Sequence, residues 1–237
     1  MSELRELQGR LRQGGELSYD EYQRILAQQE QLDDLLEMMR GNANTAHADR
    51  LVPRSAGGFA IVVGHTQTSA GAYGGPPINQ SEYPWNKDLA SKIKTICAGL
   101  GVPAKIFYRD GIGISGAYQQ VSAWGASCVV ELHFNAFNGS ARGTETLYDK
   151  DRHAGSAAWA TRLQEAMLAT LGTQDRGLKE CDPGDRGYGS VSALNIPSAL
   201  IEPFFGDNPV DAQKGHNNKD DLAEAIARTA AAQLGVA

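Results

Sequence analysis

The stretch Cys128-Val-Val-Glu-Leu-His-Phe-Asn-Ala-Phe-Asn138 is a short apolar strand pattern that ends in a polar turn. Continuous runs of Val and Leu are typical of strands buried on both faces of a parallel sheet, so this stretch predicts an interior strand of an α/β protein. His133 and Asn135 then stand where the strand ends, just before Gly139. Side chains in that position face the crevice in which open α/β sheets bind ligands.

Two further strand patterns end in the same way. Phe59-Ala-Ile-Val-Val63 is followed by Gly64 and His65, and Ser198-Ala-Leu-Ile201 is followed by Glu202. Because the carboxyl ends of parallel strands meet at one edge of a sheet, the three exits predict one shared site that carries two histidines and a carboxylate.

From residue 59 onward, strand and helix patterns alternate, which favours an α/β fold with a mixed, largely parallel sheet flanked by helices. A loop rich in Gly and Pro spans 66–81. The periodicity predicts further strands at 104–108 and 143–148, and helices at about 84–100, 115–124, 154–171 and 221–234. We expect residues 59–237 to form one catalytic domain.

The first forty residues have a different pattern. Leucines recur at helical spacing, a Gly-Gly pair interrupts them, and Ser18-Tyr-Asp-Glu21 is a capping-box signature for a second helix. We therefore expect a helical hairpin over 1–40, which serves either as an oligomerisation or targeting module, with self-association through 1–40, or as a simple extension. Residues 41–58 are expected to be a linker, in which Leu51-Val-Pro-Arg54 is either native or a protease-cleavage tag.

Composition argues against several classes of partner. The net charge is −6 and the chain has no cluster of Lys and Arg, so nothing suggests nucleic acid as a partner. No stretch approaches the length of apolar sequence that membrane insertion needs, and the charged first residues do not resemble a secretory signal. We expect a protein that is cytoplasmic when made. Three cysteines without CxxC spacing do not suggest a disulfide framework.

The residue types at the strand exits suit a metal. A catalytic zinc site has three protein ligands of the His, Glu or Asp type and one open position. His65 and His133 are candidates, and Glu82 at the start of the next helix is placed to supply the carboxylate. Glu202 then remains as a general base for activating water. The alternatives are structural histidines and, for Glu82, a favourable position at a helix N-terminus.

Taken in order, these residues resemble the zinc-dependent N-acetylmuramoyl-L-alanine amidases of the amidase 3 type. The resemblance runs from about residue 59 to 236 and depends on five ordered matches: Gly64-His65, Glu82 with Asn86, Glu131-Leu-His133-Phe-Asn135-Ala136, Gly143-Thr-Glu145, and Glu202-Pro-Phe-Phe205.

The resemblance implies a phosphorylase/hydrolase-like fold and one Zn²⁺ per chain. It also implies hydrolysis of the amide between N-acetylmuramic acid and L-alanine in peptidoglycan, by water activated at the zinc with Glu202 as general base. Asn135 and Glu145 are expected near the metal or the substrate. The setting that we expect is lysis by a phage endolysin, released from the cytoplasm to act on the cell wall, or a bacterial autolysin.

The chain also departs from the family pattern, because Glu131 stands where the family has Ser. Residues two apart share one face of a strand, so Glu131 either orients His133 or competes as a ligand. Two other functions remain open. A zinc carboxypeptidase acting on stem peptides would need a cation, for which Arg142 or Arg186 could serve, and a wall-binding or virion structural protein would keep the fold without turnover.

Overall fold

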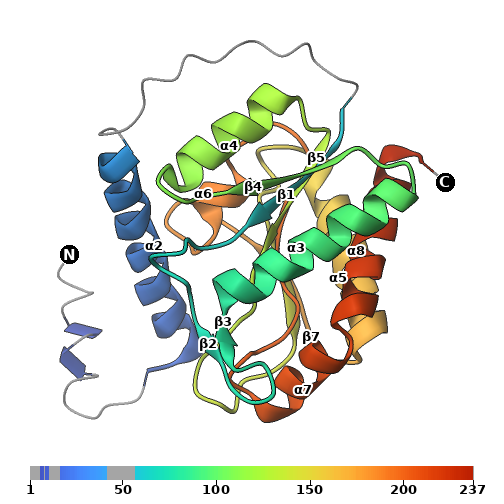
Figure 1. Cartoon of the computed structure of the whole chain (residues 1–237). Coiled ribbons are helices and arrows are strands. Elements are labelled where there is room, and N and C mark those ends of the chain that lie inside the picture. The colour runs from blue at the N-terminus through green and yellow to red at the C-terminus, as the bar shows by residue number, and fades with distance from the viewer. Residues whose placement is uncertain (1–5, 8, 11–16, 42–56, 237) are drawn as a thin grey trace.

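A computed structural model describes residues 6–7, 9–10, 17–41 and 57–236. Its centre is a six-stranded sheet in the order β4-β1-β5-β8-β6-β7 (Figure 1). Neighbouring strands run parallel except at β6 and β8, which pair antiparallel. The strands are β1 Phe59–Val63, β4 Ala104–Tyr108, β5 Cys128–Leu132, β6 Thr144–Tyr148, β7 Asp175–Glu180 and β8 Ser198–Glu202, with a small hairpin of β2 Tyr73–Gly74 and β3 Gln80–Ser81. The mixed, largely parallel sheet is confirmed.

Helices cover both faces of the sheet. Alternate residues of β1 point to opposite sides: Phe59 and Ile61 join the larger apolar cluster, and Ala60 and Val62 join the smaller one. The larger cluster packs under α3 (Glu82–Gly99), α5 (Ser156–Leu171) and α8 (Lys219–Leu234), and the smaller one packs under α4 (Gly113–Trp124). The inner strands are therefore buried on both faces, as their unbroken apolar runs predict.

Five of the described elements were not expected from the sequence pattern. They are β2 and β3, which lie within the loop predicted at 66–81, and β7, α6 (Tyr188–Val191) and α7 (Pro209–Asn217). The edge strand β7 has the sequence Asp-Arg-Gly-Leu-Lys-Glu and is half exposed, so it lacks the apolar alternation by which strands are recognised. The predicted helices at 84–100, 115–124, 154–171 and 221–234 are present, with boundaries shifted by a few residues.

The second helix expected in the N-terminal hairpin is present as α2 (Tyr19–Gly41). It begins with the predicted capping box, because the Ser18 backbone N–H donates to Glu21 and the Glu21 N–H donates to the Ser18 hydroxyl. Figure 1 shows α2 lying beside the α/β fold, and it packs against α4. Most of the first half of the hairpin, and of the linker at 41–58, lies outside the described residues. No helix in the described part is long and apolar enough to cross a membrane.

Candidate metal centre

The three predicted ligands come from three elements that meet at the carboxyl edge of the sheet. β1 and β5 are in parallel register, with Val63 beside Leu132, so the residues that follow them emerge together. His133 follows β5 directly, and His65 follows β1 after Gly64. Glu82 is the first residue of α3 and is buried. His65 has a positive φ of 64°, which turns the chain out of the strand direction at this point.

The ligand atoms of these residues converge on one point. His65 Nε2 lies 3.2 Å from Glu82 Oε2, and His133 Nδ1 lies 3.1 Å from the same oxygen. Ligands held about 2.0–2.1 Å from a tetrahedral zinc are roughly 3.3 Å apart, so the separations fit a shared ion. Two imidazoles and one carboxylate are also the donor set of catalytic zinc sites that keep an open position. The residues present therefore fit zinc.

The second ring nitrogen of His133, Nε2, has its own carboxylate partner. His133 Nε2 lies 3.0 Å from Glu131, whose carboxylate also accepts from Arg109 at 3.0 Å and from the Tyr118 hydroxyl at 2.8 Å. Burial by itself raises the pKa of Glu131, but the hydrogen bond with His133 and the charge of Arg109 outweigh it and hold that pKa at about 2. The Glu131 carboxylate is thus a charged partner of the predicted ligand His133.

The pKa of His133 depends on the two carboxylates beside it, Glu131 and Glu82. Its burial lowers the pKa, but hydrogen bonds to Glu131 and Glu82 more than compensate and raise the pKa of His133 to about 9. The pKa of Glu82 changes in the opposite direction, because the charges and hydrogen bonds of His65 and His133 outweigh its burial and lower it. Without a metal, this centre therefore favours a protonated imidazole between carboxylates.

Backbone groups fix the Glu82 carboxylate. Its Oε1 accepts from the Ala72 N–H at 2.9 Å, and its Oε2 accepts from the Phe134 N–H at 3.2 Å. Glycine is required at two close approaches. A Cβ on Gly64 would lie 2.3 Å from His133, and one on Gly71, whose φ is +77°, would lie 2.6 Å from the His65 ring. The Gly-rich loop thus lets the backbone wrap closely around the ligands.

Glu202, the predicted general base, ends β8 and is completely buried. Its carboxylate forms an ion pair with Arg186. Arg186 lines the cavity that contains His65 and His133, whereas Glu202 does not line it. The arginine therefore separates the carboxylate from the open part of the site. Arg142, the other cation considered for binding a free carboxylate, does not line this cavity.

Asn135 and Glu145 lie together on the other side of His133. The Asn135 amide donates to Glu145 Oε1 at 2.8 Å, and Arg176 donates to Glu145 Oε2 at 2.7 Å. The hydroxyl of Tyr19, from α2, donates to Glu145 at 2.6 Å and accepts from Asn135 at 2.7 Å. The two predicted residues are thus joined to each other and to the N-terminal helix.

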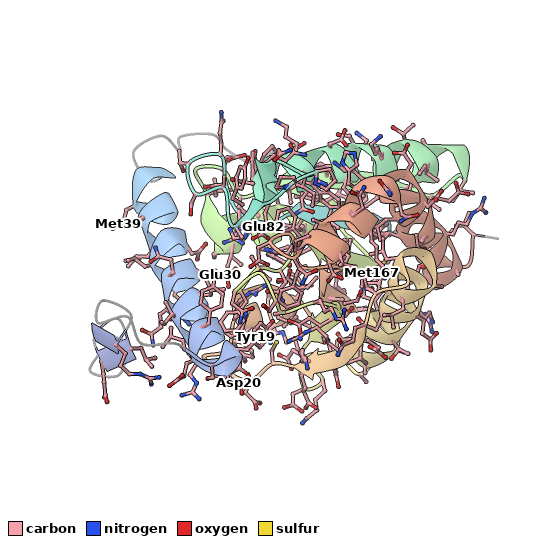
Figure 2. All side chains as sticks on the ribbon, turned by 90° about the horizontal axis from the view of Figure 1, so that it is seen from below. Tyr19, Asp20, Glu30, Met39, Glu82 and Met167 are labelled. Atoms are coloured by element: carbon pink, nitrogen blue, oxygen red, sulfur yellow. The ribbon has the colours of Figure 1, made fainter. Side chains whose placement is uncertain are left out.

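The cavity over the three ligands has a volume of about 390 Å³. Sequence reasoning missed the part of its wall that belongs to α2, formed by Tyr22, Leu26, Gln29, Glu30 and Asp34. Figure 2 shows α2 running past this side of the molecule, with Glu30 facing toward Glu82. Nothing in the sequence distinguishes Glu30 and Asp34 from the other carboxylates of this helix, and such residues usually face solvent. Arg109 was also missed, because it follows an unremarkable strand.

The sequence model of the N-acetylmuramoyl-L-alanine amidases, Amidase_3, matches residues 60–232. N-acetylmuramoyl-L-alanine amidase LytC of Bacillus subtilis is 28% identical over 169 residues, which are 69% of this chain and 32% of LytC. The uncharacterized protein YqiI of the same species is 34% identical over 96 residues, covering 40% of this chain and 44% of YqiI. The chain thus matches less than half the length of these curated relatives.

Solved structures show the same fold. The catalytic domain of CwlV, an N-acetylmuramoyl-L-alanine amidase from Bacillus (Paenibacillus) polymyxa, superimposes with a TM-score of 0.63 at 20% identity, covering 76% of this chain and 99% of that one. The catalytic domain of the CD27L endolysin, which targets Clostridia difficile, gives a TM-score of 0.62 at 25% identity. The match covers 74% of this chain and 97% of that one. About three quarters of this chain thus matches an entire catalytic domain. Since the family's own sequence model spans nearly all of the sheet and its covering helices, the chain belongs to the N-acetylmuramoyl-L-alanine amidase family.

Proposed function

We propose that this chain hydrolyses the amide bond between N-acetylmuramic acid and L-alanine in peptidoglycan. The observation that supports this most directly is the convergence of His65 Nε2 and His133 Nδ1 on Glu82 Oε2, in a chain of the amidase family. Catalytic zinc, when bound, supplies a Lewis acid that lowers the pKa of water and polarises a carbonyl. We assign its three protein ligands to His65, Glu82 and His133.

The chain's own residues hold this centre in shape. Glu131 accepts from His133 Nε2, which fixes the tautomer that presents Nδ1 to the metal. Arg109 and Tyr118 hold Glu131 in turn, so the ring orientation depends on a buried network rather than on a mobile side chain. We therefore assign Glu131 the role of a positioning residue and not of a fourth ligand.

Glu202 is our candidate for the general base. It would take a proton from the attacking water and pass it to the leaving amine of L-alanine. β8 lies next to β5 in parallel register, which places Glu202 beside the start of the His133 turn. Its carboxylate is ion-paired with Arg186, so we propose that Arg186 turns away when substrate binds. The joined side chains of Asn135 and Glu145 would then border the substrate.

The experiment uses metal-free protein and purified peptidoglycan sacculi, before and after one equivalent of Zn²⁺. We would assay both the full chain and residues 57–237, the part that matches entire catalytic domains. Zinc-dependent clearing with new amino termini on L-alanine is the expected result. Glu202→Gln should abolish turnover while it retains zinc, and His133→Ala should lose zinc.

Other outcomes point elsewhere. Release of a single terminal amino acid would show a carboxypeptidase, and binding of sacculi without soluble products from either protein would show a wall-binding protein. As the setting we propose bacteriolysis by a phage endolysin that reaches the wall after release from the cytoplasm. The similarity to the CD27L endolysin catalytic domain, at 25% identity, is compatible with this setting.

A further inference from the structure

The face that α2 turns toward the catalytic domain carries polar side chains at a regular spacing. Tyr19, Gln23, Glu30 and Asp34 are separated by four, seven and four residues, which places them along one side of a helix. With a rise of about 1.5 Å per residue, this row extends roughly 22 Å, or about four turns. Each of the four side chains makes a hydrogen bond to the catalytic domain.

The partners of this row are the groups on which the proposed reaction depends. Tyr19 bonds to Asn135 and Glu145, which we expect to border the substrate. Gln23 Oε1 accepts from Arg186 at 2.8 Å, the same arginine that is paired with the candidate base Glu202. The first half of α2 therefore holds Arg186 in the position in which it covers the base.

Glu30 binds to the groups that surround Glu131 and His133. Its Oε1 lies 3.3 Å from Arg109, the residue that holds Glu131 behind His133, and its Oε2 accepts from the Gly187 N–H at 3.2 Å. The ligand-type atoms of Glu30, Glu131 and His133 all lie within 4.8 Å of one another. A carboxylate from α2 thus lies within 4.8 Å of a predicted metal ligand and lines the same cavity as His65 and Glu82.

The apolar residues between these polar positions close the space that remains. Tyr22 and Leu26 line the cavity with His65 and Glu82, and the ring of Tyr22 packs on Phe137 at 5.2 Å between centroids. A cavity of about 390 Å³ suits a small molecule, whereas a glycan strand with its stem peptide needs an open groove. With α2 in place, side chains of this helix occupy part of the space over the predicted ligands that a polymer would need.

We propose that α2 is an intramolecular inhibitor, which occupies the peptidoglycan groove of its own catalytic domain and has to leave before substrate enters. The proposal rests on the function proposed above. Residues 42–56 join α2 covalently to the domain, and such a tether gives an effective concentration on the order of millimolar. A helix that binds only weakly when free would therefore still occupy the groove in the intact chain.

The test compares the full chain with residues 57–237 on a soluble disaccharide-peptide and on sacculi. Three quarters of this chain matches an entire solved catalytic domain, so the fold is complete without α2. We expect kcat/KM to be at least tenfold higher for the fragment. A synthetic peptide of residues 17–41 should bind the fragment, as measured by fluorescence anisotropy, and should inhibit it competitively.

Point variants of the full chain test the contacts without removing the helix. Glu30→Gln takes away a charged partner of the buried Arg109, so kcat/KM should rise roughly tenfold and hydrogen exchange in α2 should speed up. Asp20→Asn is the matched control, because it removes a carboxylate from the exposed side of the same helix and should change neither quantity. Glu30→Gln in the synthetic peptide of residues 17–41 should weaken its binding to the fragment, whereas Asp20→Asn in the same peptide should not.

The outcomes separate this proposal from the proposed reaction. Equal kcat/KM for the two proteins, together with no binding of the 17–41 peptide to a folded, zinc-binding fragment, would overturn the inhibitor. If neither protein hydrolyses peptidoglycan, binding is the decisive readout. Displacement of the labelled peptide from the fragment by the disaccharide-peptide would then support the inhibitor although the reaction had failed, and its absence would overturn the inhibitor as well.

Discussion

His133 lies at the centre of the site, because each of its ring nitrogens has a carboxylate partner. Nδ1 is 3.1 Å from Glu82, and Nε2 is 3.0 Å from Glu131. A zinc ion held by His133 Nδ1 and Glu82 would replace the first contact and leave the second in place. The two carboxylates therefore have different roles at one imidazole, and this difference leads to two predictions.

Binding of zinc should release a proton from His133. With a pKa of about 9, this imidazole is almost fully protonated at pH 7 in the metal-free protein, and a ligand has to be neutral. Apparent zinc affinity should therefore rise by up to about tenfold per pH unit until pH 9 and level off above it. Isothermal titration calorimetry in buffers of different ionisation enthalpy measures the release.

Glu131→Gln provides the control for that measurement. Removing the carboxylate that helps to raise the pKa of His133 should reduce the proton release at pH 7. An unchanged release in this variant would show that the proton comes from another group.

Glu131→Gln should also weaken zinc binding by about 10–100-fold, because the second partner of a ligating histidine sets its orientation and basicity. Competition with a chromogenic chelator measures this affinity, with the melting temperature recorded to confirm folding. Glu145→Gln is the matched control, since Glu145 is a buried carboxylate that is not paired with a ligand. If both variants bind zinc equally well, Glu131 does not position His133.

At the scale of elements, α7 is supported by one N-terminal side chain. Asn208 Oδ1 accepts from the Val210 and Asp211 N–H groups, and its Nδ2 donates to the carbonyls of Gly139 and Ser140. The residue therefore caps the helix and also ties it to the turn that follows the His133 motif.

Two substitutions separate these contributions. Asn208→Ala removes the cap and the bonds to Gly139 and Ser140, and it should lower the free energy of unfolding by about 2 kcal/mol. Asn208→Asp keeps the cap and loses only the bonds to the two carbonyls, so it should lower the free energy of unfolding by about half as much. Urea denaturation followed by circular dichroism measures both values. Equal losses for the two variants would show that the cap contributes nothing.

On the scale of the whole molecule, the proposed zinc site joins β1, β5 and the start of α3, three elements that are distant in sequence. An ion that binds only the folded chain stabilises it by about 2.7 kcal/mol when free zinc is 100 times its dissociation constant. For a chain of this size that corresponds to a rise of roughly 5–10 °C in melting temperature. Scanning calorimetry measures the rise, and His65→Ala should remove most of it.

The sequence also indicates how the whole molecule is divided, but not how its parts meet. Tyr19–Gly41 is recognisable as a helix from its capping box, and residues 59–237 from their alternating pattern. The division into a hairpin at 1–40, a linker and a catalytic domain stays a prediction. What the pattern did not suggest is that this helix lies over the carboxyl edge of the sheet and lines the cavity.

What the sequence determined by itself is whatever depends on local chemistry and periodicity. Apolar runs of five residues are buried on both faces wherever they occur, so the inner strands and the residues at their ends follow from the chain alone. His65, His133 and Glu82 could be named in this way because strand exits in a parallel sheet converge. The half-exposed strand β7 could not be predicted from the sequence, because its residues do not form an apolar run or an alternating pattern.

Only the tertiary structure decided which partners these residues have. The arginines at 109 and 186 are ordinary in sequence, yet one holds the carboxylate behind His133 and the other covers Glu202. Glu30 looks like a solvated helix residue until α2 packs against the sheet edge. Contacts between residues 79 or 163 positions apart depend on how complete elements pack, and no local pattern specifies that geometry.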